Sequence, residues 1–460
     1  MFIGKRPAGF GNDTRIFKGE IMMIRLIVPF LGYLLKGDRR YVYYFRLRSN
    51  LRLSKDEIHE LQARKLRQMI RYVHTHVPFY RDYFFKNKID PEDIKTPRDL
   101  VLLPILTKQI IKDNLKNLKS DIQRDFVKVT SGGSTGETSV VFKSPYFIQM
   151  SRATTLRNMA IAGWYPYDKS VWIWGAPYEH QQIADSLLAR IGTYVNGRLM
   201  LNAYNYSPKF FPNWTRKIMS FKPKILYGYA SIILEYAKWC YLNGVSFDSI
   251  KSVVSTTEKL ADRKLIEDAF KCKVYDQYGS REVLSIATEC KCGNLHVSDD
   301  TAIVQQTQEN ELIITALDSF HFPLIRFKIG DIGKLQESKC LCGLNFSTMG
   351  LDIGRVTDNF IRPNGQKISG SALATYISTL DLAFNKYQLI QKDIHLFEAV
   401  IVGDQEVLEH SKGKFINALE EYFGQISVNF TLVKELPVEP SGKRLLFKCL
   451  IKVNESTSSK

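Results

Sequence analysis

Residues 54–73 repeat apolar side chains at the spacing of one helix face, namely Ile58, Leu61, Leu66, Met69 and Val73. Ser54 and Glu57 can form a capping box at the start of this segment, and Pro78 follows its end. The pattern therefore predicts a long amphipathic helix close to the N-terminus.

From about residue 125, short apolar runs alternate with helical patterns. The runs expected to form strands lie at 170–177, 224–230, 252–258 and 273–279. Most of them end in glycine or polar turns, and helical patterns fill the segments between them. This alternation is typical of an α/β domain with a mainly parallel sheet, in which ligands bind beyond the carboxyl ends of the strands.

The pattern changes after Gly354, where strands and a helix near 405–423 indicate a compact α+β unit. We therefore expect three parts, which are an N-terminal extension at 1–50, a large N-terminal domain at 51–354 and a small C-terminal domain at 355–460.

Residues 21–35 form an apolar run that contains Arg25 and Pro29 and precedes the basic and aromatic segment 36–49. A membrane-spanning helix needs roughly 20 apolar residues, so this run is too short to cross a bilayer. Two interpretations stay open: a helix of the core, or an interfacial segment that rests on an anionic membrane.

The composition is that of a folded protein. Of the 460 residues, 45% are hydrophobic and 12% are aromatic, whereas disordered chains are poor in both. The formal net charge of +17 favours anionic partners such as acidic phospholipid or phosphorylated small molecules. A solvated basic surface is the plainer interpretation. We expect no nucleic-acid partner, because the sequence has no zinc-finger, RNA-binding or helix-turn-helix signature.

The seven cysteines are an odd number in a long chain without a secretory signal, which favours a reducing compartment. We therefore expect a cytoplasmic protein, with peripheral attachment to the inner face of the membrane as the alternative.

One loop has the composition of a phosphate-binding nest. TSGGSTGET, at 130–138, holds three glycines and five hydroxyl residues. Glycine lets backbone N–H groups turn inward, and the hydroxyls add further donors. It is not a Walker A loop, because no Gly-Lys-Ser/Thr ends it. A flexible surface linker is the alternative.

Four later motifs carry candidate chemistry. They are YDQYGSRE at 275–282, RFKIGDIG at 326–333, GRVTDNFIRPNGQKIS at 354–369 and LPVEPSGKRLLFK at 436–448. Tyr278 could stack on a base, and Glu282 could hold Mg²⁺. Asp331, expected to be exposed after a turn at Gly330, could accept hydrogen bonds from two ribose hydroxyls. Taken alone, a buried Tyr278 and a surface Glu282 would be the plainer interpretation.

The cysteines suggest a separate metal site, because ECKCGNLH at 289–296 and KCLCG at 339–343 each place glycine after Cys-x-Cys. Two such turns can present four thiolates tetrahedrally to a structural Zn²⁺; these are Cys290, Cys292, Cys340 and Cys342. His296 could replace one cysteine, and two chance pairs of free thiols are the alternative.

In order and spacing, the five motifs resemble those of the adenylate-forming superfamily of acyl-CoA synthetases, peptide-synthetase adenylation domains and luciferases. The phenylacetate–CoA ligase-like branch is the most similar, including its members linked to capsular polysaccharide biosynthesis. The resemblance covers about residues 55–450. It implies a small mobile C-terminal domain, and an enzyme that uses ATP and Mg²⁺ to convert a carboxylate into an acyl-adenylate. A thiol, usually that of CoA, then displaces AMP.

The resemblance also assigns roles to individual positions. The β- and γ-phosphates would be cradled by Ser131, Gly132, Gly133, Ser134, Thr135 and Gly136. The nucleotide and acyl pocket would be lined by Ser255, Thr256, Thr257 and Glu258. Tyr278, followed by Gly279 and Ser280, would face the adenine.

The remaining roles concern charge. Glu282 would hold Mg²⁺, and Asp331 would bind ribose. Arg355 would lie near the ribose and the domain junction. Lys443 would contact the reacting carboxylate and the α-phosphate.

Some positions depart from the pattern of the superfamily. Thr357 stands where an acidic hinge residue is common, and Lys367 where many CoA synthetases have arginine. These departures leave the acceptor open among CoA, a carrier thiol, and an amine or hydroxyl of a sugar. A degenerate adenylate-binding scaffold at the membrane is the non-enzymatic alternative.

Overall fold

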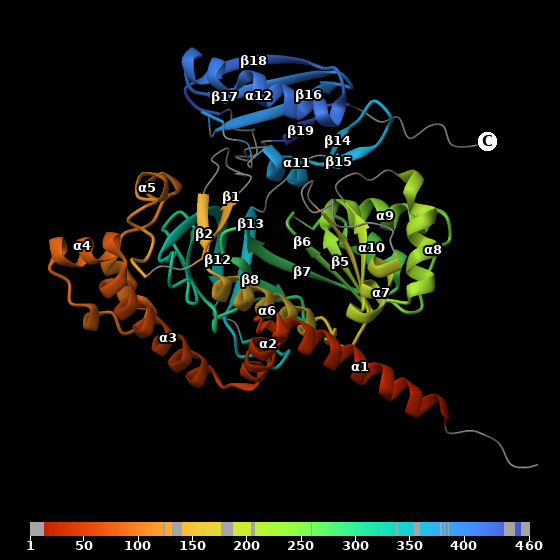
Figure 1. Ribbon diagram of the computed structural model, residues 1–460, viewed down its shortest axis with the longest axis horizontal. Coiled ribbons are helices and arrows are strands. Elements are labelled where there is room, and N and C mark those ends of the chain that lie inside the picture. The colour runs from red at the N-terminus through yellow and green to blue at the C-terminus, as the bar shows by residue number, and fades with distance from the viewer. Residues whose placement is uncertain are drawn as a thin grey trace, which may run out of the picture.

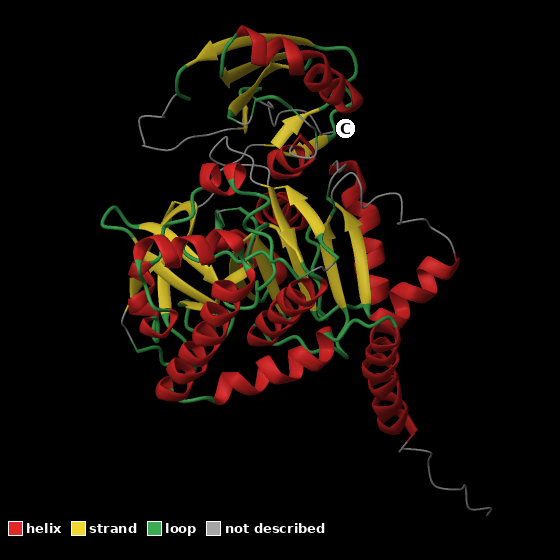
Figure 2. Cartoon of the chain, turned by 60° about the vertical axis from the view of Figure 1, so that its left-hand side comes forward, coloured by secondary structure: helices red, strands yellow, loops and turns green. Residues whose placement is uncertain are grey.

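The computed structural model describes residues 13–122, 125–130, 140–175, 187–203, 208–258, 260–336, 339–353, 359–377, 380, 382–384, 386–436 and 447–451. A large domain with one broad sheet carries a smaller C-terminal unit above it (Figure 1). Figure 2 shows helices on both sides of the broad sheet.

The chain begins with helices α1 (Asp13–Leu35), α2 (Arg40–Ser49), α3 (Lys55–His76), α4 (Pro78–Asn87) and α5 (Lys108–Asp113). The helix predicted at 54–73 is confirmed as α3. Ser54 caps its first turn, and the Ser54–Glu57 capping box is present. Pro78 begins the next helix, because proline has no N–H to lose at a first helical position.

Eleven strands form the broad sheet, in the order β10-β11-β12-β13-β9-β8-β7-β6-β5-β3-β4. In chain order these are β3 (Ser170–Trp174), β4 (Arg198–Asn202), β5 (Ile225–Tyr229), β6 (Ser252–Thr256), β7 (Lys273–Ser280), β8 (Leu284–Glu289), β9 (Leu295–Val297), β10 (Ala302–Gln306), β11 (Glu311–Ala316), β12 (Phe327–Gln336) and β13 (Thr348–Ile353). A separate hairpin is formed by β1 (Val127–Thr130) and β2 (Val140–Lys143).

The α/β class is confirmed, but the sheet is mixed rather than mainly parallel. The neighbouring pairs β4–β3, β3–β5, β5–β6 and β6–β7 are parallel. Beyond β7 every neighbouring pair is antiparallel. The change occurs because no described helix crosses over between the strands after β7, and hairpin-like connections join antiparallel neighbours.

Helices cover both faces of the parallel half. On one face α2 and α6 (Pro145–Ile161) pack against side chains such as Trp172 and Tyr227. On the other lie α8 (Phe211–Phe221), α9 (Ala230–Leu242) and α10 (Arg263–Phe270). Helix α7 (Leu187–Asn196) lies beside β4 at the sheet edge. This three-layer arrangement leaves the carboxyl ends of the parallel strands available for a site.

The C-terminal unit has its own four-stranded sheet, in the order β18-β17-β16-β19. Its strands are β16 (Tyr387–Asp393), β17 (Leu396–Val402), β18 (Ser427–Val433) and β19 (Phe447–Cys449). The helix expected near 405–423 is α12 (Gln405–Phe423), and α11 (Gly370–Ile377) and the hairpin of β14 (Asn359–Ile361) and β15 (Lys367–Ser369) complete the unit. Its core is separate from the cores of the large domain.

Among the described residues, an ion pair joins the unit to the large domain. Lys367 Nζ of β15 donates to Glu235 Oε1 of α9 at 3.0 Å. Both side chains are about one quarter exposed, at 25% and 22%.

Candidate functional site

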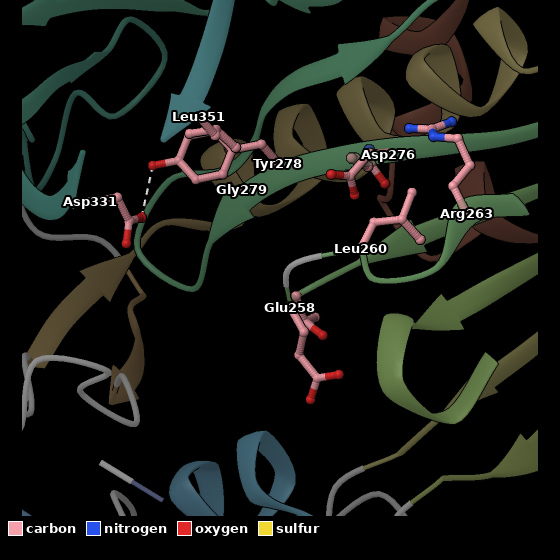
Figure 3. Close-up of a pocket in the computed structure, with 10 residues that line it drawn as sticks. Glu258, Leu260, Arg263, Asp276, Tyr278, Gly279, Asp331 and Leu351 are labelled. Atoms are coloured by element: carbon pink, nitrogen blue, oxygen red, sulfur yellow. Dashed lines mark hydrogen bonds between the residues drawn. The ribbon is translucent and has the colours of Figure 1, made fainter. Parts of the chain in front are cut away.

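A pocket of about 210 Å³ opens where β6 and β7 end (Figure 3). It is lined by Thr257, Glu258, Leu260, Arg263, Asp276, Gln277, Tyr278, Gly279, Asp331 and Leu351. Four of these residues come from β7, which lies where the parallel half of the sheet meets the antiparallel half. The structure therefore brings Thr257, Glu258, Tyr278, Gly279 and Asp331, all predicted from the sequence, to one pocket.

Tyr278 and Asp331 contact one another at one side of this pocket (Figure 3). The Tyr278 hydroxyl donates to Asp331 Oδ2 at 2.8 Å. The expected exposure of Asp331 is wrong, because only 6% of it is exposed. Gly330 has a φ of 90° and lies where the pairing of β12 with β11 is irregular, but the strand continues through it instead of ending in a turn. Alternate residues of this strand point inward, and Asp331 follows Phe327 and Ile329 in that register.

The residues after β6 are held in an unusual backbone conformation. Thr257 has a φ of 73°, which is rare for a β-branched residue and stores strain. The next residue, Glu258, accepts a hydrogen bond from the backbone N–H of Ser231 at 2.9 Å. Ser231 lies in the first turn of α9, where a helix favours negative charge. The strained turn therefore presents Glu258 at the pocket.

Ser255 and Thr256 do not line the pocket but support it from behind. The Ser255 hydroxyl donates to Asp276 Oδ1 at 2.9 Å. The Thr256 hydroxyl donates to the backbone carbonyl of Gln277 at 3.1 Å. Both bonds tie β6 to β7 beneath the pocket and fix the positions of the residues that line it.

Asp276 is a lining residue that the sequence analysis did not single out, although it lies within the tyrosine motif. Burial raises the pKa of its carboxyl to about 6, more than the Ser255 hydrogen bond lowers it. The Asp276 backbone N–H donates to Glu289, which also pairs with Arg263 at 2.7 Å. Arg263 begins α10, so its place in the pocket depends on a tertiary contact that no local motif encodes.

Glu282 and Ser280 are not among the residues that line the pocket. Glu282 is buried, with 2% exposure, so the plainer interpretation of a surface Glu282 is wrong. It lies near Lys143, whose Nζ donates to the Arg281 carbonyl at 2.5 Å. Burial lowers the pKa of Lys143 to about 7, although the charge of Glu282 opposes this. The Ser280 hydroxyl accepts from the Val283 N–H at 3.1 Å, which shapes the turn before Glu282.

Several predicted residues lie outside the described residues. They are Ser131, Gly132, Gly133, Ser134, Thr135, Gly136, Arg355 and Lys443. Their roles stay predictions.

A cysteine–histidine cluster forms a second candidate site. The ligand atoms of Cys290, His296, Cys340 and Cys342 all lie within 4.8 Å of one another. Cys292 is exposed and lies outside this set, although its side chain interacts with that of Cys340. The set agrees with the alternative in which His296 replaces one cysteine, and the identity of the metal ligands stays a prediction. His296 lies beside these cysteines because β9 pairs with β13, the strand that follows the second Cys-x-Cys turn.

Two separations within the cluster can be compared with those of a tetrahedral zinc site. Zn–S bonds of about 2.3 Å and Zn–N bonds of about 2.0–2.1 Å imply ligand separations of about 3.8 Å for S···S and about 3.6 Å for S···N. Cys290 Sγ lies 3.6 Å from Cys340 Sγ, and Cys342 Sγ lies 3.3 Å from His296 Nε2. His296 Nδ1 lies 2.9 Å from the Phe346 carbonyl, which can only accept. The proton is therefore on Nδ1, and Nε2 faces the thiols as a metal ligand would.

The glycines after both Cys-x-Cys pairs allow the chain to turn sharply beside the thiols. Gly293 and Gly343 have φ angles of 83° and 91°, in the region that other residues avoid. Each turn directs a backbone N–H at the first thiol of its pair, from Cys292 to Cys290 at 3.4 Å and from Cys342 to Cys340 at 3.5 Å.

The architecture is that of adenylate-forming ligases. A 2-hydroxyisobutyryl-CoA ligase, in the postadenylation state in complex with R3-HIB-AMP, matches with a TM-score of 0.55 and 15% identity over 88% of this chain and 92% of that chain. The same ligase with 2-HIB-AMP and CoA in the thioesterification state matches with a TM-score of 0.56 and 14% identity over 87% and 92%.

Relatives in sequence show which members of this class of ligases the chain is similar to. The chain is homologous to Protein CapK of Staphylococcus aureus, with 26% identity over 92% of this chain and 96% of the relative. It is also homologous to phenylacetate-coenzyme A ligases, with 22% identity to that of Thermus thermophilus over 74% of this chain and 79% of the relative. Residues 360–449 match the family model of the CapK C-terminal domain.

Proposed function

We propose that this protein is an ATP-dependent, AMP-forming ligase that activates a carboxylic acid. A carboxylate oxygen attacks the α-phosphorus of ATP, pyrophosphate leaves, and an acyl-adenylate forms. The thiol of CoA, or another thiol, then attacks the acyl carbon, and AMP leaves with the bonding electrons. The observation that carries this proposal is the pocket at the place where the parallel half of the sheet joins the antiparallel half. The hydrogen bond between Tyr278 and Asp331 lies in this pocket.

The residues of the pocket suit an adenosine group. The flat ring of Tyr278 can stack against a base, and the Asp331 carboxylate can accept hydrogen bonds from ribose hydroxyls. Glu258, held at the start of α9, lies in the same pocket and would orient the nucleotide or the acid. Glu282 would hold Mg²⁺, which would neutralise phosphate charge when bound. Residues 131–136 would contact the β- and γ-phosphates.

The acid would bind beside the carboxyl ends of β3 and β5. Trp174 and Tyr229 stack there with ring centroids 4.7 Å apart and an interplanar angle of 14°. Flat aromatic faces favour an acid with an aryl or sugar ring. The relationship to Protein CapK supports a role in capsular or exopolysaccharide biosynthesis, in which a sugar amine or hydroxyl would be an alternative acceptor.

Pyrophosphate release in the presence of ATP and Mg²⁺, measured against a panel of aryl and sugar acids, tests this proposal. Acid-dependent release supports adenylation, and a second panel of CoA, thiols and amino sugars then identifies the acceptor. Nucleotide binding without release for any acid would instead favour a degenerate adenylate-binding scaffold.

We also propose that Cys290, His296, Cys340 and Cys342 hold a structural Zn²⁺. The separations between their ligand atoms and the orientation of His296 support this. Four protein ligands leave no open position on the ion for a substrate. The ion would therefore stabilise the connections among β8, β9, β12 and β13 and would have no catalytic role.

A further inference from the structure

Helix α1 has apolar side chains on two opposite faces. On the inner face Phe30 and Tyr33 pack against Tyr41, with ring centroids 6.4 and 5.7 Å away. Arg25 lies over the ring of Tyr194 in α7 at 5.0 Å. The outer face nevertheless exposes large apolar residues, which are Met23, Ile27, Val28, Leu31, Leu34 and Leu35. Leu35 is 88% exposed and Met23 is 55% exposed. These outer residues fall within about 140° of the helix circumference at 3.6 residues per turn, so they form one continuous stripe.

Helix α2 continues this surface with a mixture of apolar and basic side chains. Val42 and Phe45 are exposed, at 43% and 42%. Arg39, just before the helix, and Arg46 are exposed on the same arc of its circumference. Exposed apolar residues flanked by arginines suit a membrane interface, because the long arginine side chains can keep their charged ends at the phosphates beside a shallow apolar contact.

The charge of these helices is predominantly positive. Residues 13–52 contain nine basic residues and three acidic residues, of which Asp38 lies between the two helices. Asp38 is already paired with Arg40, and it lies 3.5 Å from Arg152. The surface therefore carries a positive charge that a neutral partner would not compensate.

A pocket of about 390 Å³ lies next to Phe45, between α2, the 3₁₀ turn Asn50–Arg52 and the end of α6. It is lined by Phe45, Arg48, Ser49, Leu51, Arg52, Ala160 and Tyr165. Arg48 lies over the Tyr165 ring at 4.6 Å, which fixes the position of its guanidinium. Two arginines and a serine beside an exposed phenylalanine provide donors for a phosphate group whose acyl chains lie against apolar residues.

We propose that the outer faces of α1 and α2 form a docking surface for an anionic bilayer. The apolar stripe of α1 enters the acyl boundary, the arginines around α2 contact the lipid phosphates, and the pocket of Arg48 and Arg52 holds one headgroup. The protein lies on the membrane, because no helix among the described residues is long and apolar enough to cross one.

Charge complementarity favours a bilayer over a second copy of the chain. A symmetric dimer through this surface would place the same arginines of two copies against each other, and like charges repel. An anionic bilayer supplies both the apolar medium and the opposite charge. The proposal rests on these helices alone and stands whether or not the chain is a ligase.

The position of the helices suits this role. Figure 1 shows α1 and α2 along the edge of the large domain that lies away from the C-terminal unit. Docking by that edge would leave the C-terminal unit and the pocket of Tyr278 and Asp331 facing the solvent.

Co-flotation of the full chain with vesicles tests the proposal. We expect binding to vesicles of phosphatidylcholine with 30% phosphatidylglycerol and little binding to phosphatidylcholine alone (the lipid ratio is roughly that of an anionic bilayer). Leu31→Glu combined with Leu35→Glu should weaken binding at least about tenfold, since it places charge in the acyl boundary. Arg39→Glu and Arg46→Glu should each weaken it about fivefold or more, and high salt should do the same.

The matched control is Phe85→Glu, which changes an equally exposed apolar residue, at 86%, on α4. This variant should float like the wild type, and thermal unfolding should show that every variant is folded. Inorganic phosphate at millimolar concentration should not release the protein if a bilayer is the ligand. Equal binding by wild type and the Leu31/Leu35 variant, release by phosphate alone, or a lipid-free dimer abolished by that variant would each overturn the proposal.

Discussion

The Tyr278 hydroxyl donates to Asp331 Oδ2 at 2.8 Å, although the two residues are 53 positions apart in the chain. Tyr278 comes from β7 and Asp331 from β12, and three strands of the sheet, β8, β9 and β13, lie between them. The bond links β7 and β12 across these three strands and holds a phenol ring and a carboxylate next to each other in one pocket. Its two members should therefore contribute differently to nucleotide binding.

Asp331→Ala should weaken ATP binding about 10- to 100-fold, because charge-assisted hydrogen bonds to ribose are worth about 1.5–3 kcal/mol. Tyr278→Phe retains the ring that would stack on the base and should change the affinity by less than about fivefold. Isothermal titration calorimetry with ATP and Mg²⁺ measures both. The control is Asp113→Ala, an exposed carboxylate on α5. Unchanged affinity in Asp331→Ala would remove this pocket as the ribose site.

The metal cluster predicts which cysteine is dispensable. Purified protein should contain about one zinc per chain, measured by plasma mass spectrometry. Cys340→Ser and His296→Ala should lose the zinc and unfold at a lower temperature, because binding of structural zinc contributes directly to folding. A chelator should lower the unfolding temperature of the wild type in the same way.

Cys292→Ser provides the matched control for this experiment. Cys292 belongs to the same Cys-x-Cys turn as Cys290 but lies outside the set of four. This variant should retain its zinc and its unfolding temperature. Loss of zinc from Cys292→Ser with retention in His296→Ala would restore the four-cysteine arrangement and reject the one proposed here.

Local patterns predicted some parts of this molecule well. The helix at 405–423 and the capping box of Ser54 follow from period and capping chemistry within a few residues, which one segment of sequence contains in full. The strands at 170–177, 224–230, 252–258 and 273–279 were found for the same reason, since buried parallel strands are short continuous apolar runs.

Non-local contacts explain what the sequence did not reveal. The order of the strands beyond β7 depends on pairings such as β13 with β9, which join distant segments. The position of His296 close to the three cysteines depends on that same pairing. Arg263 reaches the candidate pocket only through tertiary packing, in which it pairs with Glu289. Asp331 looked like an exposed turn residue because Gly330 precedes it, yet both residues continue one strand.

The buried carboxyl of Asp276 predicts a pH dependence of stability. Its pKa is raised from 3.8 to about 6, mainly by burial. The native state therefore favours the protonated form, and this stabilisation is present at low pH and is lost as the pH rises through about 6. Asp276→Asn has no such titration. Relative to this variant, the wild type should lose about 1–2 kcal/mol of unfolding free energy between pH 5 and pH 8.

Urea denaturation at both pH values measures this difference, with the exposed Asp113→Asn as the control. A difference between wild type and Asp276→Asn that stays constant from pH 5 to pH 8 would mean that the carboxyl is solvated in the native protein. The same result would indicate that water reaches the Asp276 carboxyl through the pocket.

Lys443 gives the sharpest test of the proposed reaction. It follows Gly442 in the C-terminal part of the chain, outside the described residues. Attack of a carboxylate on the α-phosphate brings two anions together, and a positioned ammonium would offset that charge. Such a contact is worth about 3–4 kcal/mol, or about 10²–10³ in rate. Lys443→Ala should therefore slow acid-dependent pyrophosphate release by about that factor, with ATP affinity little changed.

The second half-reaction separates chemistry from folding. If the C-terminal unit takes a different position for each half-reaction, Lys443→Ala should still convert a chemically supplied acyl-adenylate and thiol at nearly the wild-type rate. Lys434→Ala, which removes an exposed lysine of the same unit, should leave both half-reactions intact. Equal loss of both half-reactions would assign Lys443 a structural role. Undiminished pyrophosphate release would show that the Lys443 ammonium does not stabilise the transition state of adenylate formation.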